Sequence, residues 1–458
     1  MARLAPLVFA LALGGGACAS SGPGDDAAPP GAYDRRALVD ALKGDLAAEG
    51  LVVDEGSFGI FHVEDCADLP SCFGNNPASP YGLAFVPPAP GEALVDLGAP
   101  FVKAGARAVW RMREDEAVVT ILRTPPAARY LGVRSYVFSR AGETLFASLG
   151  DTLNEFVLDT EGSATAFDAE AAVITTADRA LDARLRALLA AHGVGGIANS
   201  DVVPPSVARL GLGAEADALT LLLRVALFDD GAAGDAWLAA PPALVLRVRP
   251  AAERPIDAFP APALRTRGTG TTEAGQADAL AALEQAARAA FADGLVDAVG
   301  VAPLDLRGWA CLSGGTQCLG DNADALYTAS LPIVLGSADR LVVLGVDHTR
   351  AGKATYTSLA AYDTTRQLGV GGTSDRDFGG SAAVYLAGDA RADGLFAVSF
   401  ARDCQGEAHC FTVGTAFPGV ALDAPVSIAE RAYLEPSTRT GPLGAELLRP
   451  RVLRVRPR

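Results

Sequence analysis

The feature that most constrains the fold of this chain is an internal repeat that spans nearly all of it. Residues 72–76 (CFGNN) precede Tyr81, and residues 318–322 (CLGDN) precede Tyr327 at the same offset. Further markers follow in the same order in both halves. Chance matches would not keep their order and spacing, so the pattern indicates a duplicated structural module.

The remaining markers set the limits of the two copies. Given in pairs, they are Asp115 and Asp339, Tyr130 and Tyr356, Tyr136 and Tyr362, Arg224 and Arg431, and the closing VLRVRP at 245–250 and 452–457. We therefore expect copy 1 at 33–250 and copy 2 at 275–458. Residues 251–274, rich in Pro, Gly and Thr, form the expected linker. Copy 1 has an insertion near 179–215.

Hydrophobic periodicity predicts the same mixture of elements in both copies. Apolar residues at helical spacing predict a leading helix at 38–48 and at 280–292, and another helix at 179–192 in the insertion. Predicted strands are 117–123, 134–138, 341–346 and 355–361. The fold class is α+β and β-rich: a tandem duplication of a module with a leading helix and an antiparallel sheet or sandwich. The closing VLRVR segment alternates apolar residues with Arg, which predicts a half-buried strand with Arg247 and Arg249 on its solvent face.

Six cysteines fall into three close pairs. They are Cys66 and Cys72, Cys311 and Cys318, and Cys404 and Cys410. Such pairs become disulfides in an oxidising compartment, whereas a redox role would favour C-x-x-C spacing and a zinc site would need more nearby ligands. The sequence predicts three local structural disulfides and no metal site.

The N-terminal residues have the pattern of an export signal. A positive charge, a short apolar run and small residues predict a signal peptide at 1–17. Cys18 follows Gly-Gly-Ala, which resembles a lipobox, so we expect Cys18 to carry the lipid and 18–32 to form a tether. The absence of Asp after Cys18 favours an outer membrane-anchored lipoprotein. Ala17-Cys18-Ala19 would also suit ordinary cleavage, which leaves a free periplasmic or secreted protein as the alternative.

The charge of the chain argues against one class of partner. Its 54 acidic and 38 basic residues give a formal net charge of −16. A polyanion would be repelled over most of such a surface, so we expect no nucleic-acid partner. The expected membrane contact is through the lipid anchor.

Several segments resemble a family of uncharacterised secreted proteins. They are CFGNNPASPYG, RTPPAARYLGVRSYVFSR, FASLGDTLN, CLGDNADALY, GVDHTRAGKATY and RDCQGEAHC. A weaker likeness joins residues 129–150 to bacterial proteins of unknown function built from β-sandwich domains. The resemblance covers most of the chain after the tether. It implies a β-rich fold, and it implies no activity, cofactor or catalytic residue.

The sequence lacks the standard catalytic motifs, such as G-x-S-x-G and H-E-x-x-H. Residues 345–353 (GVDHTRAGK) depart from the spacing of a phosphate-binding loop, and we expect no cofactor. The weak catalytic candidates are Asp347, His348 and Lys353, since a carboxylate can orient an imidazole for general-base chemistry. Neighbouring strand residues point to opposite faces, however, so Asp347 and His348 would not pair with each other. A structural or surface position is the competing interpretation.

Two Asx pairs could in principle bind calcium. Asn75-Asn76 and Asp321-Asn322 offer oxygen ligands, but Gly followed by Asx beside a disulfide is more typical of a tight turn. We favour the turn.

These observations leave three hypotheses for function. The leading one is a non-enzymatic envelope protein that binds a ligand or partner in the groove between the copies, because binding sites favour domain interfaces. The alternatives are a secreted hydrolase with its site around Asp347 and His348, and a structural envelope protein. A concave site that brings His348 within reach of another carboxylate would favour the hydrolase.

Overall fold

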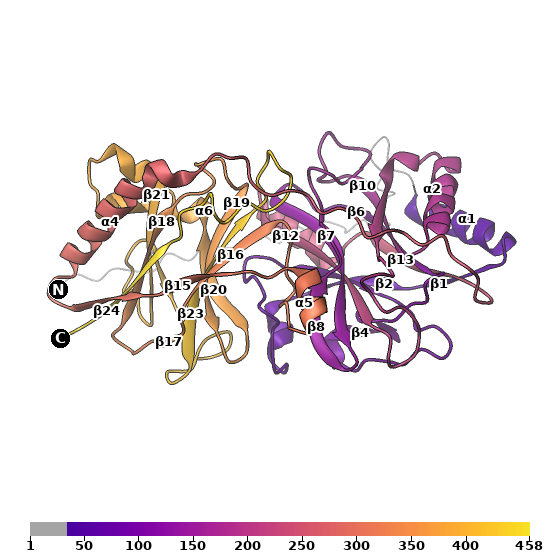
Figure 1. Ribbon diagram of the computed structural model, residues 1–458, viewed down its shortest axis with the longest axis horizontal. Helices are drawn as coiled ribbons and strands as arrows, with labels where there is room; N and C mark the ends of the chain where they lie inside the picture. Colours follow the sequence, from indigo (N-terminus) through magenta and orange to yellow (C-terminus); the bar gives the residue numbers. More distant parts are fainter. Residues whose placement is uncertain (1–33) are drawn as a thin grey trace, which may run out of the picture. The chain divides into compact units, whose positions relative to one another are not determined.

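The computed structural model describes residues 34–458. The predicted signal peptide, Cys18 and the tether lie outside the described residues. Each copy contains two mainly antiparallel sheets, and the strands of the two copies follow the same order (Figure 1). The predicted α+β, β-rich fold and its duplication are confirmed.

The first sheet of each copy has five strands. In copy 1 it contains, in spatial order, β1 (Leu51–Glu55), β13 (Ala243–Pro250), β6 (Ala117–Arg123), β10 (Glu170–Thr176) and β11 (Ala198–Val202). In copy 2 it contains β14 (Leu295–Val299), β24 (Arg451–Arg456), β18 (Arg340–Val346), β21 (Leu395–Ala401) and β22 (Cys410–Thr412). The closing VLRVR segment is thus the second strand of the sheet in both copies.

The second sheet is also equivalent in the two copies. In copy 1 it contains β2 (Ser57–Phe61), β3 (Tyr81–Phe85), β12 (Ala218–Phe228), β7 (Ala128–Arg140) and β8 (Glu143–Ser148), with β9 (Leu153–Asn154) beside β7. In copy 2 it contains β15 (Val301–Leu304), β16 (Ala325–Ser330), β23 (Pro425–Tyr433), β19 (Tyr356–Asp363) and β20 (Leu368–Ser374), with β17 (Ile333–Val334) beside β23. A separate hairpin joins β4 (Val102–Lys103) and β5 (Ala106–Arg107).

The core of each copy lies between its two sheets. In copy 1, Val118 and Val173 of the first sheet pack with Val133 and Leu221 of the second. Six helices accompany the sheets within 34–458. Three of them are predicted by the periodicity: α1 (Arg35–Ala48), α2 (Arg179–Ala191) and α4 (Ala277–Ala290). The other three are α3 (Gly231–Ala239), α5 (Gly308–Gly314) and α6 (Asp375–Phe378). Leu280 and Leu283 of α4 pack on the outer face of the first sheet of copy 2. None of the helices within 34–458 is long and apolar enough to cross a membrane.

The insertion in copy 1 has a counterpart in copy 2. Helix α2 connects β10 to β11, which pair in parallel. The corresponding parallel strands β21 and β22 are connected by the loop that the Cys404–Cys410 disulfide closes. All three predicted disulfides are confirmed. A short covalent loop therefore replaces a helix at the same position of the fold.

The prediction that Arg247 faces solvent is wrong. Its side chain is fully buried, and the guanidinium contacts Glu92 and Glu116, each at 2.6 Å. The loop after β3 covers this face of the sheet and also supplies the carbonyl of Pro87 as an acceptor. Arg249, the next arginine of the strand, is half-buried and lies 3.1 Å from Asp54.

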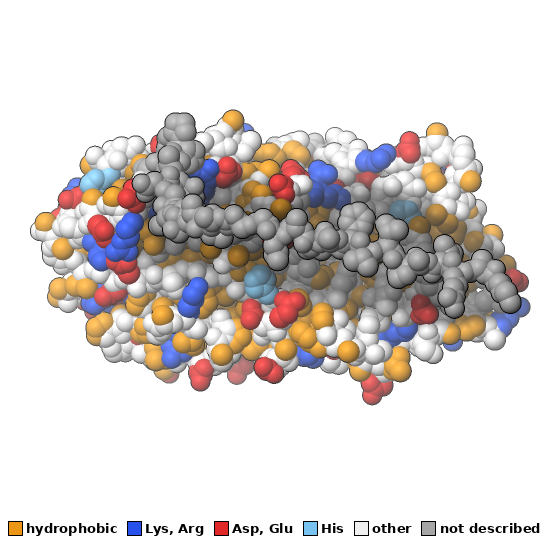
Figure 2. Space-filling model, turned by 180° about the vertical axis from the view of Figure 1, so that it is seen from behind, with side chains coloured by type: hydrophobic (Ala, Val, Ile, Leu, Met, Phe, Trp, Pro, Cys, Tyr) orange, Lys and Arg blue, Asp and Glu red, His pale blue; other side chains and the backbone are white. Residues whose placement is uncertain are grey.

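Charged side chains of both signs are interspersed with apolar ones where described residues are visible in Figure 2. The visible part of this face has no extended basic patch of the kind that binds nucleic acid.

Candidate functional site

The two copies meet through the turns that the first two disulfides close. Turn 72–76 of copy 1 bonds to the two residues just before β20 in copy 2, and turn 318–322 of copy 2 bonds to β8 in copy 1. The equivalent bonds are Cys72 N–H to Arg366 O (2.9 Å) and Gly74 N–H to Gln367 O (2.8 Å), and Cys318 N–H to Leu145 O (2.7 Å) and Gly320 N–H to Phe146 O (2.8 Å). The interface is therefore reciprocal, because each copy forms backbone hydrogen bonds with the turn of the other.

The Asx residues of these turns also bind the opposite copy. Asn75 accepts a hydrogen bond from the Gly369 N–H at 2.7 Å and donates one to the Gly369 carbonyl at 3.3 Å. Asp321 accepts from the Ser148 N–H at 2.8 Å and from its hydroxyl at 2.7 Å. Their oxygens are thus used in fixing the turns. Within 34–458 no group of His, Cys, Asp or Glu has the arrangement of a metal site.

Two arginines at equivalent repeat positions complete the interface. Arg224 of copy 1 donates to the Gly320 carbonyl of copy 2 at 2.5 Å and also contacts Tyr136. Arg431 of copy 2 donates to the Gly74 carbonyl of copy 1 at 2.6 Å. The pattern is the same in both directions.

The aromatic surroundings of the two guanidinium groups are also equivalent. Arg224 lies over the rings of Tyr81 and Tyr136, at 5.9 and 5.1 Å from their centroids. Arg431 lies over Tyr327 and Tyr362, at 5.7 and 5.4 Å. These distances are those of cation–π contacts, which favour a charged guanidinium.

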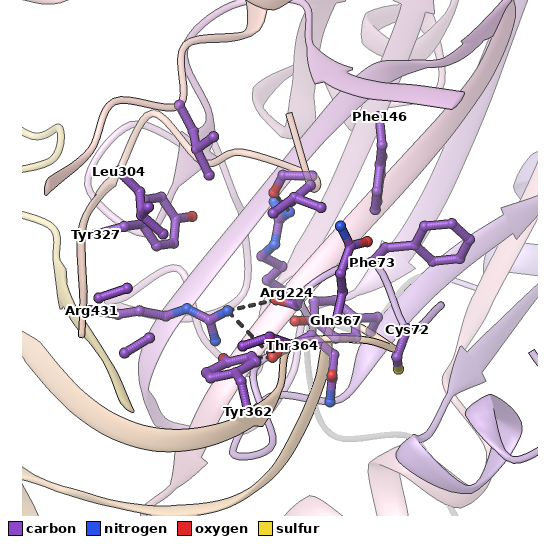
Figure 3. A pocket seen from close by; sticks show the side chains of 18 of the residues that line it. Cys72, Phe73, Phe146, Arg224, Leu304, Tyr327, Tyr362, Thr364, Gln367 and Arg431 are labelled. Atoms are coloured by element: carbon purple, nitrogen blue, oxygen red, sulfur yellow. Dashed lines mark hydrogen bonds between the residues drawn. The ribbon is translucent and has the colours of Figure 1, made fainter. Parts of the chain in front are cut away.

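A cavity of about 440 Å³ lies at this interface, with walls from both copies. Figure 3 shows Arg431 reaching in beside Tyr327 and Tyr362, with Phe73 and Phe146 on the opposite side. Most of the wall is apolar or aromatic; the aromatic members are Phe61, Phe73, Phe101, Phe138, Phe146, Tyr81, Tyr327, Tyr362 and Tyr433. Its size is in the range of small-molecule sites.

Strand alternation explains which residues reach the cavity. On β23, Ser427, Ala429, Arg431 and Tyr433 line it, while Ile428 packs into the core on the other face. On β12 the same spacing brings Thr220, Leu222 and Arg224 to the wall. The second sheets of both copies therefore present one face each to the cavity.

The charge in this cavity is one-sided. Among residues 34–458 its lining includes Arg224 and Arg431 but no Asp, Glu, Lys or His. Burial raises the pKa values of Tyr327, Tyr362 and Tyr433 above their ordinary range, so their phenols stay neutral at physiological pH. The two guanidinium groups are consequently the formal charges of the wall.

His348, one of the weak catalytic candidates, lies on the opposite face of β23, beside Glu430. His348 Nδ1 is 2.6 Å from Glu273 Oε1, and its Nε2 is 3.4 Å from Glu430 Oε1. His348 and Glu430 line a second cavity of about 370 Å³, which shares Leu304, Leu306 and Tyr327 with the first. The structure thus places His348 in a concave site within reach of two carboxylates.

Asp347 and Lys353 do not join His348. Asp347 accepts hydrogen bonds from the N–H and hydroxyl of Thr349, at 3.1 and 2.6 Å, and so fixes the turn after β18. Lys353 Nζ is buried between Glu435 and Glu446, at 2.9 and 2.6 Å. The three candidates therefore serve three separate sets of contacts.

The protonation of His348 weakens its case as a base. Burial alone would lower its pKa, but the carboxylates of Glu430 and Glu273 outweigh burial and raise the pKa of His348 to about 10. At neutral pH both ring nitrogens then carry protons, and the imidazolium cannot accept another. In copy 1 the equivalent residue, Thr124, bonds the Ala169 carbonyl at 3.1 Å.

No family model matches the chain, and no curated protein matches it. A crystal structure of an uncharacterised protein from Burkholderia cenocepacia is similar over 92% of this chain and 87% of that one, with 15% identity and a TM-score of 0.42.

The repeat predicts a groove between the copies, but no sequence motif marks the two arginines in it. The signal was present, because Arg224 and Arg431 stand at equivalent offsets before the closing segment. A charged residue kept in both copies, together with paired tyrosines, also indicates a shared contact.

Proposed function

We propose that this chain is a non-enzymatic binding protein, exported and lipid-anchored in the cell envelope, whose ligand occupies the cavity between the copies. The observation that carries the proposal is the cavity of about 440 Å³, whose aromatic and aliphatic walls come from both copies. Concave, mainly apolar sites with a few placed polar groups are typical of small-molecule binding.

Export is supported by the cysteine chemistry. Six cysteines of the described chain form three local disulfides, which persist in oxidising compartments. The lipid anchor rests on the sequence pattern before Cys18.

Binding of a neutral apolar probe tests the proposal. N-phenyl-1-naphthylamine should fluoresce more strongly with the purified chain, and decanol should displace it. Ala329→Trp places a large ring on the cavity wall and should abolish the enhancement. Ala236→Trp, on the exposed face of α3, is the matched control and should keep it. An unchanged signal in Ala329→Trp would place the probe elsewhere and reject the proposal.

The hydrolase alternative receives one point of support, since His348 and Glu430 line the second cavity. The high pKa of His348 counts against it, because a base must be able to accept a proton. Turnover of ester or amide substrates that His348→Asn abolishes would favour this alternative. A structural envelope protein would neither bind the probe nor turn over substrate.

A further inference from the structure

The reciprocal turns differ at one position beside the two arginines. Asp321 of copy 2 follows Gly320, whose carbonyl accepts a hydrogen bond from Arg224 at 2.5 Å. The equivalent residue of copy 1, beside Arg431, is Asn75, whose backbone carbonyl is 3.3 Å from Arg431 Nη2. Asn75 is neutral, so the two arginines have different electrostatic surroundings.

Arg431 is the less compensated of the two cations. Its side chain is more than nine-tenths buried. Its guanidinium contacts neutral groups, namely the Gly74 carbonyl and the ring of Tyr362. Within 34–458, its buried Nε and Nη1 have no hydrogen-bond acceptor, whereas Nη1 and Nη2 of Arg224 both donate, to Tyr136 and to Gly320. A buried charge without a partner is costly, so an anion beside it would be strongly favoured.

The wall around Arg431 sets a second requirement for a ligand of this cavity. Arg431 lies on a wall that is otherwise apolar or aromatic, between Tyr327 and Tyr362 (Figure 3). A small inorganic anion would leave most of that wall uncovered. A ligand that satisfies both features carries a negative group at one end and an apolar body at the other.

We propose that the cavity between the copies recognises an amphipathic anion, an apolar chain or ring with one oxyanion group, and that Arg431 receives the oxyanion. This inference rests on the proposed function, since it names the ligand class of the same cavity. The oxyanion is a carboxylate or a phosphate, since both have the oxygen geometry that a guanidinium binds.

Matched ligands that share a ten-carbon chain test the inference. Decanoate, decyl phosphate, decanol and decyltrimethylammonium compete for N-phenyl-1-naphthylamine on the full chain. We expect the better anion to bind roughly tenfold to a hundredfold more tightly than decanol, as for a charge-assisted hydrogen bond. The ammonium should bind more weakly than decanol. Comparison of the two anions decides between a carboxylate and a phosphate head group.

Variants assign the preference to Arg431. Arg431→Gln should bring the ratio of anion to alcohol affinity close to 1, whereas Arg391→Gln, an exposed arginine, should leave the ratio unchanged. Asn75→Asp gives turn 72–76 the carboxylate that turn 318–322 already has, and should also reduce the ratio. If Arg431→Gln does not fold, as judged by circular dichroism, Asn75→Asp carries the test.

The outcomes separate the two proposals. If neither decanol nor the anions displace the probe, the proposed function itself fails. Equal binding of decanol and both anions leaves the binding function in place and overturns the oxyanion inference. An anion preference that persists in both Arg431→Gln and Asn75→Asp overturns the assignment to Arg431.

Discussion

Arg431 in the second copy donates a hydrogen bond to the carbonyl of Gly74 in the first copy at 2.6 Å. In the opposite direction, Arg224 of the first copy donates a hydrogen bond to the carbonyl of Gly320 in the second copy. The cores are shared as well, because Cys311, Leu312 and Cys318 of copy 2 pack into the core cluster of copy 1. Residues 34–458 therefore form one compact unit, and we expect the two copies to unfold together.

Unfolding should reflect this sharing. We expect a single cooperative transition in urea, and Arg224→Met should lower the free energy of unfolding by about 2–3 kcal/mol, because it leaves the buried Gly320 carbonyl without its charged donor. Arg391→Met, at an exposed site, is the control. Two separate transitions in the unmodified protein would contradict a shared core.

A substitution at Gly308 tests how closely the two copies approach each other. It begins helix α5 (Gly308–Gly314), which lies beside β8 of copy 1 (Figure 1). A Cβ at Gly308 would lie 2.1 Å from the Ser148 carbonyl oxygen, so Gly308→Ala should destabilise the protein by about 1–3 kcal/mol. Gly44, within α1, has open space around it, and Gly44→Ala should stabilise by about 0.5–1 kcal/mol. Thermal unfolding of both variants measures the contrast.

Stability should fall as the pH rises above neutrality. The pKa of His348 is raised from 6.5 to about 10 in the folded protein, so its contribution is complete below about pH 6.5 and is lost as the pH rises through 10. His348→Asn should be less stable overall, because it leaves Glu273 and Glu430 without the imidazolium. Its loss of stability between pH 8 and 10 should nevertheless be smaller. Urea midpoints at each pH measure both effects.

Two carboxyls, that of buried Asp324 and that of half-buried Glu155, act in the same direction at lower pH. Burial raises the pKa of Glu155 to about 8 and that of Asp324 to about 7, so both favour the protonated folded state. Glu155→Gln should therefore remove part of the stability loss between pH 4.5 and 8. An equally steep loss in Glu155→Gln would show that this carboxyl titrates normally.

The Cys404–Cys410 loop should matter for stability because it replaces a helical connection. Cys404→Ser with Cys410→Ser should cost about 2–3 kcal/mol, as expected for a short closed loop. Mass mapping without reduction should find the three local pairs in the unmodified chain. A Cys66–Cys318 cross-link would be incompatible with the reciprocal interface.

The lipid anchor can be tested directly in cells. Labelled palmitate should be incorporated into the full-length chain, and Cys18→Ser should abolish incorporation. Secretion of an unlabelled, cleaved protein would favour the ordinary cleavage site at Ala17-Cys18-Ala19.

Local patterns predicted the elements of this fold well. The strand predicted at 117–123 coincides with β6, and the helix predicted at 179–192 ends one residue beyond α2. Periodicity reports how a segment buries its own side chains, and that information is local. The repeat added the long-range organisation, because equivalent segments adopt equivalent structures.

Local periodicity carries no information about contacts between distant segments. Alternation placed Arg247 on the solvent face, but Glu92, 155 residues earlier in the chain, lies over that face and pairs with it. Glu273 reaches His348 from the segment that leads into α4. Neither partner has a sequence signal, since burial of an ion pair depends on which loop covers which sheet.

The difference between Asn75 and Asp321 has a consequence that concerns symmetry. In a homodimer with such a reciprocal interface, every substitution is made twice, so both sides of a shared cavity must change together. Joining the two copies in one chain removes that restriction. One turn can carry a carboxylate and the other an amide. The two sides of a cavity built from repeated parts can then differ in charge.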